Sequence, residues 1–144
     1  MLKILWNDSL ATGVKAIDQE HRALIDLYNS LLDSVLQGRS QSITAGKLER
    51  LVQFTVDHFA EEERLMTESG YPELESHREL HLRIQEKVRE LASRFEREGT
   101  VIDSDALVLL KEWVVDHTLK SDHDYLPWLR KAGLVPAEAT DREA

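Results

Sequence analysis

Residues 17–35, IDQEHRALIDLYNSLLDSV, repeat apolar side chains at intervals of three and four residues. This interval places the apolar side chains along one face of an α-helix, so the stretch predicts an amphipathic helix packed against a core. Asp18 can cap the start of the helix and Gly38 follows its end, which predicts a helix at about 18–37. The same periodicity governs most of the chain on both sides of this segment.

Further helices are predicted at about 42–68, 73–97 and 104–120, and a short one at about 123–131. Ser69-Gly70 and Gly99 are typical helix ends, Pro72 suits a first turn, and Asp103 or Ser104 can cap the fourth helix. The prolines and glycines are taken to lie between these segments. We therefore predict an all-α fold: an antiparallel up-down-up-down four-helix bundle with an extended N-terminal arm and a short C-terminal helix.

Length and composition narrow the class of protein. The 144 residues suit a single domain spanning 1–144, and a net charge of −9 argues against a nucleic-acid partner. No apolar run is long enough to cross a membrane and no signal peptide is visible, so we expect a cytoplasmic protein, with its charged faces favouring a monomer. With no cysteine, any metal must be bound by nitrogen and oxygen atoms.

Five of the six histidines fall on the predicted apolar faces: His21, His58, His77, His81 and His117. A single histidine in such a place is usually a neutral core residue with a hydrogen-bond partner. Five together in one small bundle would leave several unmet hydrogen bonds, each costing about 1–3 kcal/mol. A shared metal site removes that cost.

Spacing along the helices sharpens this interpretation. His77 and His81 are four residues apart, as are His58 and Glu62, and such pairs lie on the same helix face. Glu62 therefore points into the bundle, where a carboxylate needs a partner or a metal. Its neighbours Glu61 and Glu63 are about 100° away on either side and are predicted to lie on a solvated face.

Asp122 is less regular, because five helical residues after His117 it points some 140° away. Either a π-type bulge in the fourth helix or an exit from the helix near Ser121 would bring Asp122 back. His123, Asp124 and Asp116 are rivals for this role. Five imidazoles with two carboxylates exceed the needs of one tetrahedral zinc, so two metal ions are predicted.

These residues resemble the bacterial members of the hemerythrin family, which are non-haem di-iron proteins that bind oxygen. The resemblance covers nearly the whole chain and lies in WN at 6–7, GV at 13–14, IDQEH at 17–21, HFAEEE at 58–63, HRELH at 77–81 and the span from Trp113 and His117 to Asp122. It implies that His77, His81 and His117 hold one iron, that His21 and His58 hold the other, and that Glu62, Asp122 and an oxo or hydroxo group bridge them. Dioxygen is then the ligand of the second iron.

Leu24 and Trp113 lie one turn from His21 and His117 respectively, so we expect both to flank the oxygen pocket. Thr118, directly after His117, is the third predicted pocket residue. It stands where the resemblance leads us to expect an apolar residue, and its hydroxyl could donate a hydrogen bond or admit water. No substrate site or general acid is visible, so the leading hypothesis is a reversible oxygen carrier or store and not an enzyme. The alternatives are a redox enzyme reducing peroxide or nitric oxide, oxygen or redox sensing through a partner, and a metal-free structural bundle. An oxygen-receiving protein as partner is left open.

Overall fold

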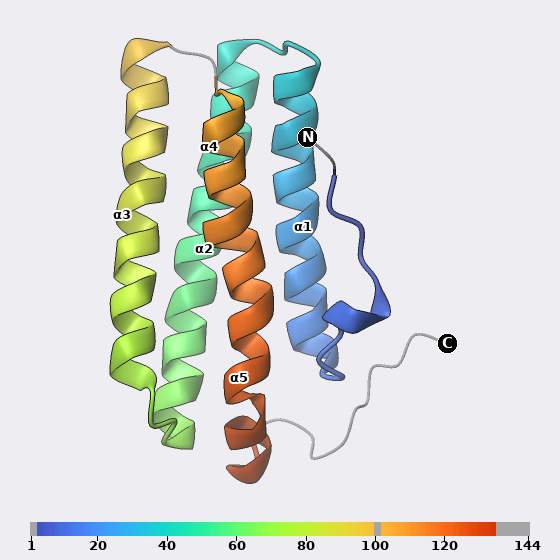
Figure 1. The fold of residues 1–144 in the computed structure, drawn as a ribbon, viewed down its shortest axis with the longest axis vertical. Helices are drawn as coiled ribbons and strands as arrows, with labels where there is room; N and C mark the ends of the chain where they lie inside the picture. The colour runs from blue at the N-terminus through green and yellow to red at the C-terminus, as the bar shows by residue number, and fades with distance from the viewer. Residues whose placement is uncertain (1–2, 100–101, 135–144) are drawn as a thin grey trace.

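The computed structural model describes residues 3–99 and 102–134, apart from the side chains of Trp113, Val114 and Asp122. Its elements are η1 (Asp8–Leu10), α1 (Lys15–Leu36), α2 (Gln41–Ser69), α3 (Leu74–Glu98), α4 (Ser104–Leu109), η2 (Leu110–Asp116) and α5 (His117–Lys131). Figure 1 shows α1, α2 and α3 beside one continuous helical segment made of α4, η2 and α5 end to end, called the fourth rod below. The predicted four-helix bundle is confirmed, and no strand occurs within the described ranges.

The ends of the helices follow mostly from local chemistry. The Ser40 hydroxyl accepts a hydrogen bond from the Ile43 amide at the start of α2, and the Asp103 carboxylate accepts one from the Ala106 amide at the start of α4. Gly70 ends α2 with a φ of 71°, a left-handed conformation that favours glycine. The predicted ends of the first three helices and the predicted start of the fourth therefore lie within three residues of the observed ones.

The predicted cap of the first helix is wrong. The helix α1 begins at Lys15 without a side-chain cap, so Asp18 lies inside its first turn. The Asp18 carboxylate instead accepts hydrogen bonds from the Thr12 amide and hydroxyl, both at 2.8 Å. Asp18 therefore ties the N-terminal arm to α1, along which Figure 1 shows the arm running. Further along the arm, the Ile4 amide and carbonyl bond to the Asn29 side chain at 2.9 and 2.8 Å.

The fourth rod also differs from the prediction. A separate short helix at 123–131 does not form, because α5 continues from His117 to Lys131 with Pro127 inside it. Proline leaves the carbonyl four residues earlier without its helical partner. That carbonyl belongs to His123, which is exposed, so water can bind it. The prediction that prolines and glycines lie between the helices is therefore wrong at two positions, because Gly46 also lies inside a helix, α2.

The apolar core consists of two clusters separated by a polar layer. On α1, His21 lies between Ile17 of the smaller cluster and Leu24 of the larger one. On α2, Glu62 lies between Phe59 of the larger cluster and Met66 of the smaller one. The histidines thus form a layer across the bundle with apolar packing on both sides. No helix in the described part of the chain is long and apolar enough to cross a membrane.

Candidate metal centre

Glu62 is the centre of the polar layer. Its side chain is 1% exposed, and its two oxygens face different imidazoles. Oε1 lies 3.1 Å from Nε2 of His77 and 3.0 Å from Nε2 of His81, whereas Oε2 lies 3.2 Å from Nε2 of His58. Burial opposes ionisation, but the three surrounding imidazoles outweigh it and hold the pKa of the Glu62 carboxyl well below its usual range. The Tyr125 hydroxyl also donates to Oε2, at 3.4 Å.

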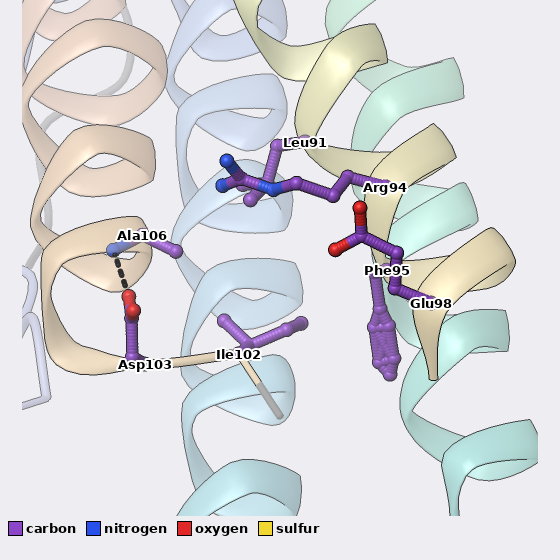
Figure 2. A pocket seen from close by; sticks show the side chains of 7 residues that line it. All are labelled: Leu91, Arg94, Phe95, Glu98, Ile102, Asp103 and Ala106. Carbon is purple, nitrogen blue, oxygen red and sulfur yellow. Dashed lines mark hydrogen bonds between the residues drawn. The ribbon is translucent and has the colours of Figure 1, made fainter. Parts of the chain in front are cut away.

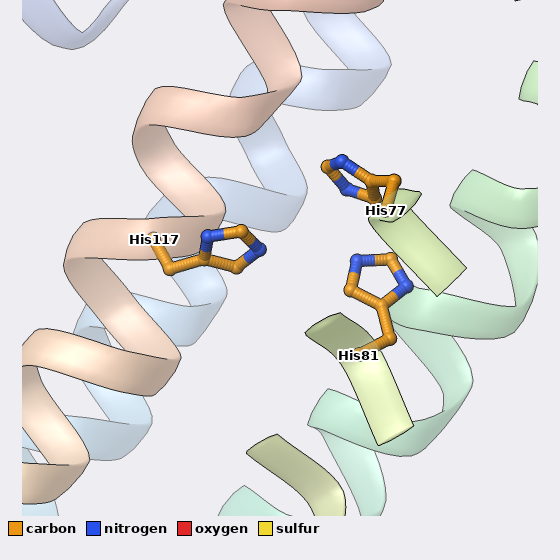
Figure 3. Close-up of side chains that lie close together, drawn as sticks. All are labelled: His77, His81 and His117. Carbon is orange, nitrogen blue, oxygen red and sulfur yellow. The ribbon is translucent and has the colours of Figure 1, made fainter. Parts of the chain in front are cut away.

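His77, His81 and His117 form a group on one side of Glu62. Each offers one ring nitrogen, and these nitrogens all lie within 4.8 Å of one another. Figure 3 shows the two imidazoles from α3 facing the one from α5. Burial, and then the neighbouring His77 and His81, lower the pKa of His117 to about 4, so its ring is neutral at pH 7. A neutral imidazole is the form that binds a metal.

The other side of Glu62 holds two imidazoles. The ring centroids of His21 and His58 are 5.9 Å apart, and Nδ1 of His58 lies 3.6 Å from the Glu20 carboxylate. Burial, and then His58, lower the pKa of His21 to about 4. Burial would also lower the pKa of His58, but the nearby carboxylates of Glu20 and Glu62 raise it to about 9. The layer therefore divides into three imidazoles and two imidazoles with one carboxylate between them.

Six of the seven predicted ligands thus meet in one layer, and the side chain of Asp122 lies outside the described residues. The π-helical segment η2 does occur in the fourth rod, but it ends at Asp116, before His117. The helix then continues through Ser121, so the proposed exit there is wrong. Asp122 as a ligand remains a prediction. Its rivals lie elsewhere: His123 and Asp124 are exposed, and Asp116 pairs with Lys111 at 3.4 Å.

The π-helical segment η2 accounts for the spacing of two buried residues in the fourth rod. Leu110 and Val115 are both fully buried although they are five residues apart. An α-helix repeats after three or four residues, whereas a π-helix bonds residue i to i+5 and brings such residues to the same face.

Glu63 is the main residue that the sequence interpretation missed. It was predicted to face solvent, yet its side chain is 22% exposed and Oε2 lies 3.0 Å from Nδ1 of His81. Glu61, by contrast, is exposed as predicted, and it pairs with Arg64. A signal for its role was available in the sequence. Glu63 directly follows the predicted ligand Glu62, and Arg78, of opposite charge, directly follows the predicted ligand His77, so the two could pair beside the site.

The structure describes the side chains of two of the three residues predicted to line the oxygen pocket. Leu24 is 2% exposed and Thr118 is 1% exposed, so both lie in the interior, whereas the side chain of Trp113 lies outside the described residues. A cavity of about 240 Å³ lies away from these residues and is lined by Leu91, Arg94 and Ile102 among others (Figure 2). It lies where α3 ends and α4 begins, at the opposite end of the bundle from His77 and His81. It is therefore separate from the histidine layer.

Substituting one histidine at a time tests this layer. His58→Ala is expected to lose bound iron, because it removes an imidazole that is 5% exposed and faces Glu62. His123→Ala removes an exposed imidazole and should keep the iron content of the unmodified protein. Iron per chain, measured after desalting, gives the comparison. Full iron in both variants would contradict the ligand set.

Comparisons with known proteins show what this chain is similar to. Residues 12–129 match the family described as hemerythrin HHE cation binding domain. A bacteriohemerythrin of Pseudomonas aeruginosa is 32% identical over 130 residues, covering 90% of this chain and 84% of that protein. A myohemerythrin of Riftia pachyptila is 29% identical over 121 residues, covering 84% and 89%. A crystal structure of wild-type hemerythrin aligns with a TM-score of 0.79 at 26% identity, covering 89% and 98%.

Proposed function

Because this chain belongs to the hemerythrin family, we propose that it binds dioxygen reversibly at a di-iron centre and acts as an oxygen carrier or store, not as an enzyme. The observation that carries the proposal is the position of Glu62, whose two oxygens face two separate groups of imidazoles. A carboxylate placed in this way is suited to bridge two metal ions. The donors are only nitrogen and oxygen, which iron accepts.

In this proposal, His77, His81 and His117 hold one iron, and His21 and His58 hold the other. Glu62 and Asp122 would be shared between the two irons, together with an oxo or hydroxo group. The support is the division of the layer into three and two imidazoles around one buried carboxylate. The unequal division gives the second iron fewer protein ligands, which leaves a position for dioxygen.

When bound, the two irons supply the electrons that dioxygen takes up on binding and returns on release. The protein's own part is to keep the imidazoles aimed and the site dry. Phe59, fully buried, stacks on the His81 ring with centroids 3.8 Å apart. Leu24 covers the layer near His21 and is 2% exposed. Excluding water in this way prevents side reactions and strengthens electrostatic interactions inside the site.

Metal analysis combined with oxygen titration tests the proposal. We expect two irons per chain, a visible charge-transfer band that appears with air and fades under vacuum, and dioxygen uptake in proportion to the iron pairs. Steady-state assays with a reductant and either peroxide or nitric oxide separate a carrier from a redox enzyme. Rapid turnover in these assays would refute the carrier role, and a colourless zinc protein would refute the di-iron site.

A further inference from the structure

The ring of His81 is constrained from three directions. Phe59 stacks on its face with an interplanar angle of 3°, and Glu62 lies 3.0 Å from Nε2. On the opposite edge, Oε2 of Glu63 lies 3.0 Å from Nδ1. His81 is itself 1% exposed, so water does not compete for these contacts. The stacking fixes the plane of the ring, but only the two carboxylates determine which nitrogen faces the interior.

Glu63 is held in turn by Arg78. The Arg78 Nε donates to Oε1 of Glu63 at 3.0 Å, and its Nη1 donates to Glu75 at 3.1 Å. The two oxygens of Glu63 therefore have separate tasks, one toward the arginine and one toward His81. The chain of contacts joins α2 to α3 at the level of the histidine layer, and the Glu63 side chain is 22% exposed. Partial burial makes this carboxylate interact more strongly than one on the surface.

We propose that Glu63, held by Arg78, is a positioning residue that fixes the tautomer of His81 and thereby its ability to hold iron. The inference rests on the proposed di-iron function. Only Glu63 hydrogen-bonds to this ring, because Nε2 of His81, although close to Glu62, has no hydrogen-bond partner among the described residues. A carboxylate only accepts hydrogen bonds, so the Nδ1 of His81 carries the hydrogen. A neutral ring with hydrogen on Nδ1 has its lone pair on Nε2, the nitrogen that faces Glu62 and the interior. The negative charge of Glu63 also makes that nitrogen a stronger donor to a metal.

The substitution Glu63→Gln tests the tautomer directly. With Arg78 in place, the single amide oxygen of glutamine is drawn to the guanidinium, so its NH₂ group faces His81. His81 must then accept at Nδ1 and carry its hydrogen on Nε2, which blocks the metal ligand. Removing Arg78 as well lets the amide turn and present its oxygen to His81. The double variant is therefore expected to bind iron better than the single one.

The experiment measures how fast a chelator removes iron from the loaded protein. We expect Glu63→Gln to lose iron about 10-fold faster or more, as is typical when the hydrogen-bond partner of a metal ligand is lost. Arg78→Ala alone should have a smaller effect, and Glu63→Gln/Arg78→Ala should recover part of the loss. Glu61→Gln makes the same chemical change on the exposed face and should leave the rate unchanged. Thermal midpoints of the iron-free variants separate ligand positioning from a general loss of stability.

Different results overturn different claims. If the unmodified protein holds no iron, the proposed function fails and this inference fails with it. If the unmodified protein holds two irons but Glu63→Gln loses them no faster than Glu61→Gln, only the role of Glu63 is refuted. The tautomer argument is also refuted if the double variant loses iron as fast as Glu63→Gln, or if the faster loss is matched by a lower midpoint of the iron-free protein.

Discussion

Glu62→Ala is expected to abolish iron binding altogether. The substitution removes both oxygens that face the imidazoles of His58, His77 and His81, so neither group of histidines keeps its shared carboxylate. It also leaves the ring nitrogens of His58 and His77 that face Glu62 without a charged acceptor, at a cost of about 1–3 kcal/mol for each unsatisfied group. Iron per chain after desalting should therefore fall from two to none.

Two further variants make this result specific. Glu61→Ala removes a carboxylate from the adjacent position, where it pairs with Arg64 at the surface, and should keep both irons. Glu62→Gln keeps the size of the side chain but has only one oxygen to accept or to coordinate. We expect it to lose iron as well, which would exclude a simple packing defect. Two tightly held irons in Glu62→Ala would refute the central role of this residue.

Removing the iron is expected to lower the thermal midpoint of the protein by about 10 °C. A ligand that binds only the folded state stabilises it by about 4 kcal/mol when present at a thousand times its dissociation constant. In a protein of this size each kcal/mol moves the midpoint by about 2–4 °C. The stripped protein must also keep buried imidazoles and the Glu62 carboxylate together in an apolar interior without their metals.

Calorimetry of the loaded, stripped and reloaded protein measures this shift. Reloading with iron should restore the original midpoint, and Glu62→Ala should show no response to added iron. Equal midpoints for the loaded and stripped forms would mean that the bundle folds independently of its metals. That outcome would favour a structural bundle over a metal-dependent one.

Some properties of the protein follow from the sequence by itself. The helices follow from apolar residues repeated at three and four positions, and the facing of His58 with Glu62 follows from the fixed turn of a helix. These are local properties, set by neighbours along the chain. For the same reason the sequence placed Glu62 in the interior, where the structure shows it 2% exposed.

Only the tertiary structure decided how the helices lie against one another. The contact from Glu63 to His81 spans α2 and α3, and its geometry depends on the register of two helices and on the reach of a long side chain. Helix spacing gives the direction in which a side chain leaves the backbone, and it does not tell where a flexible carboxylate ends. In the same way Asp18 was expected to cap its own helix but bonds to Thr12, because the folded arm brings that donor within reach.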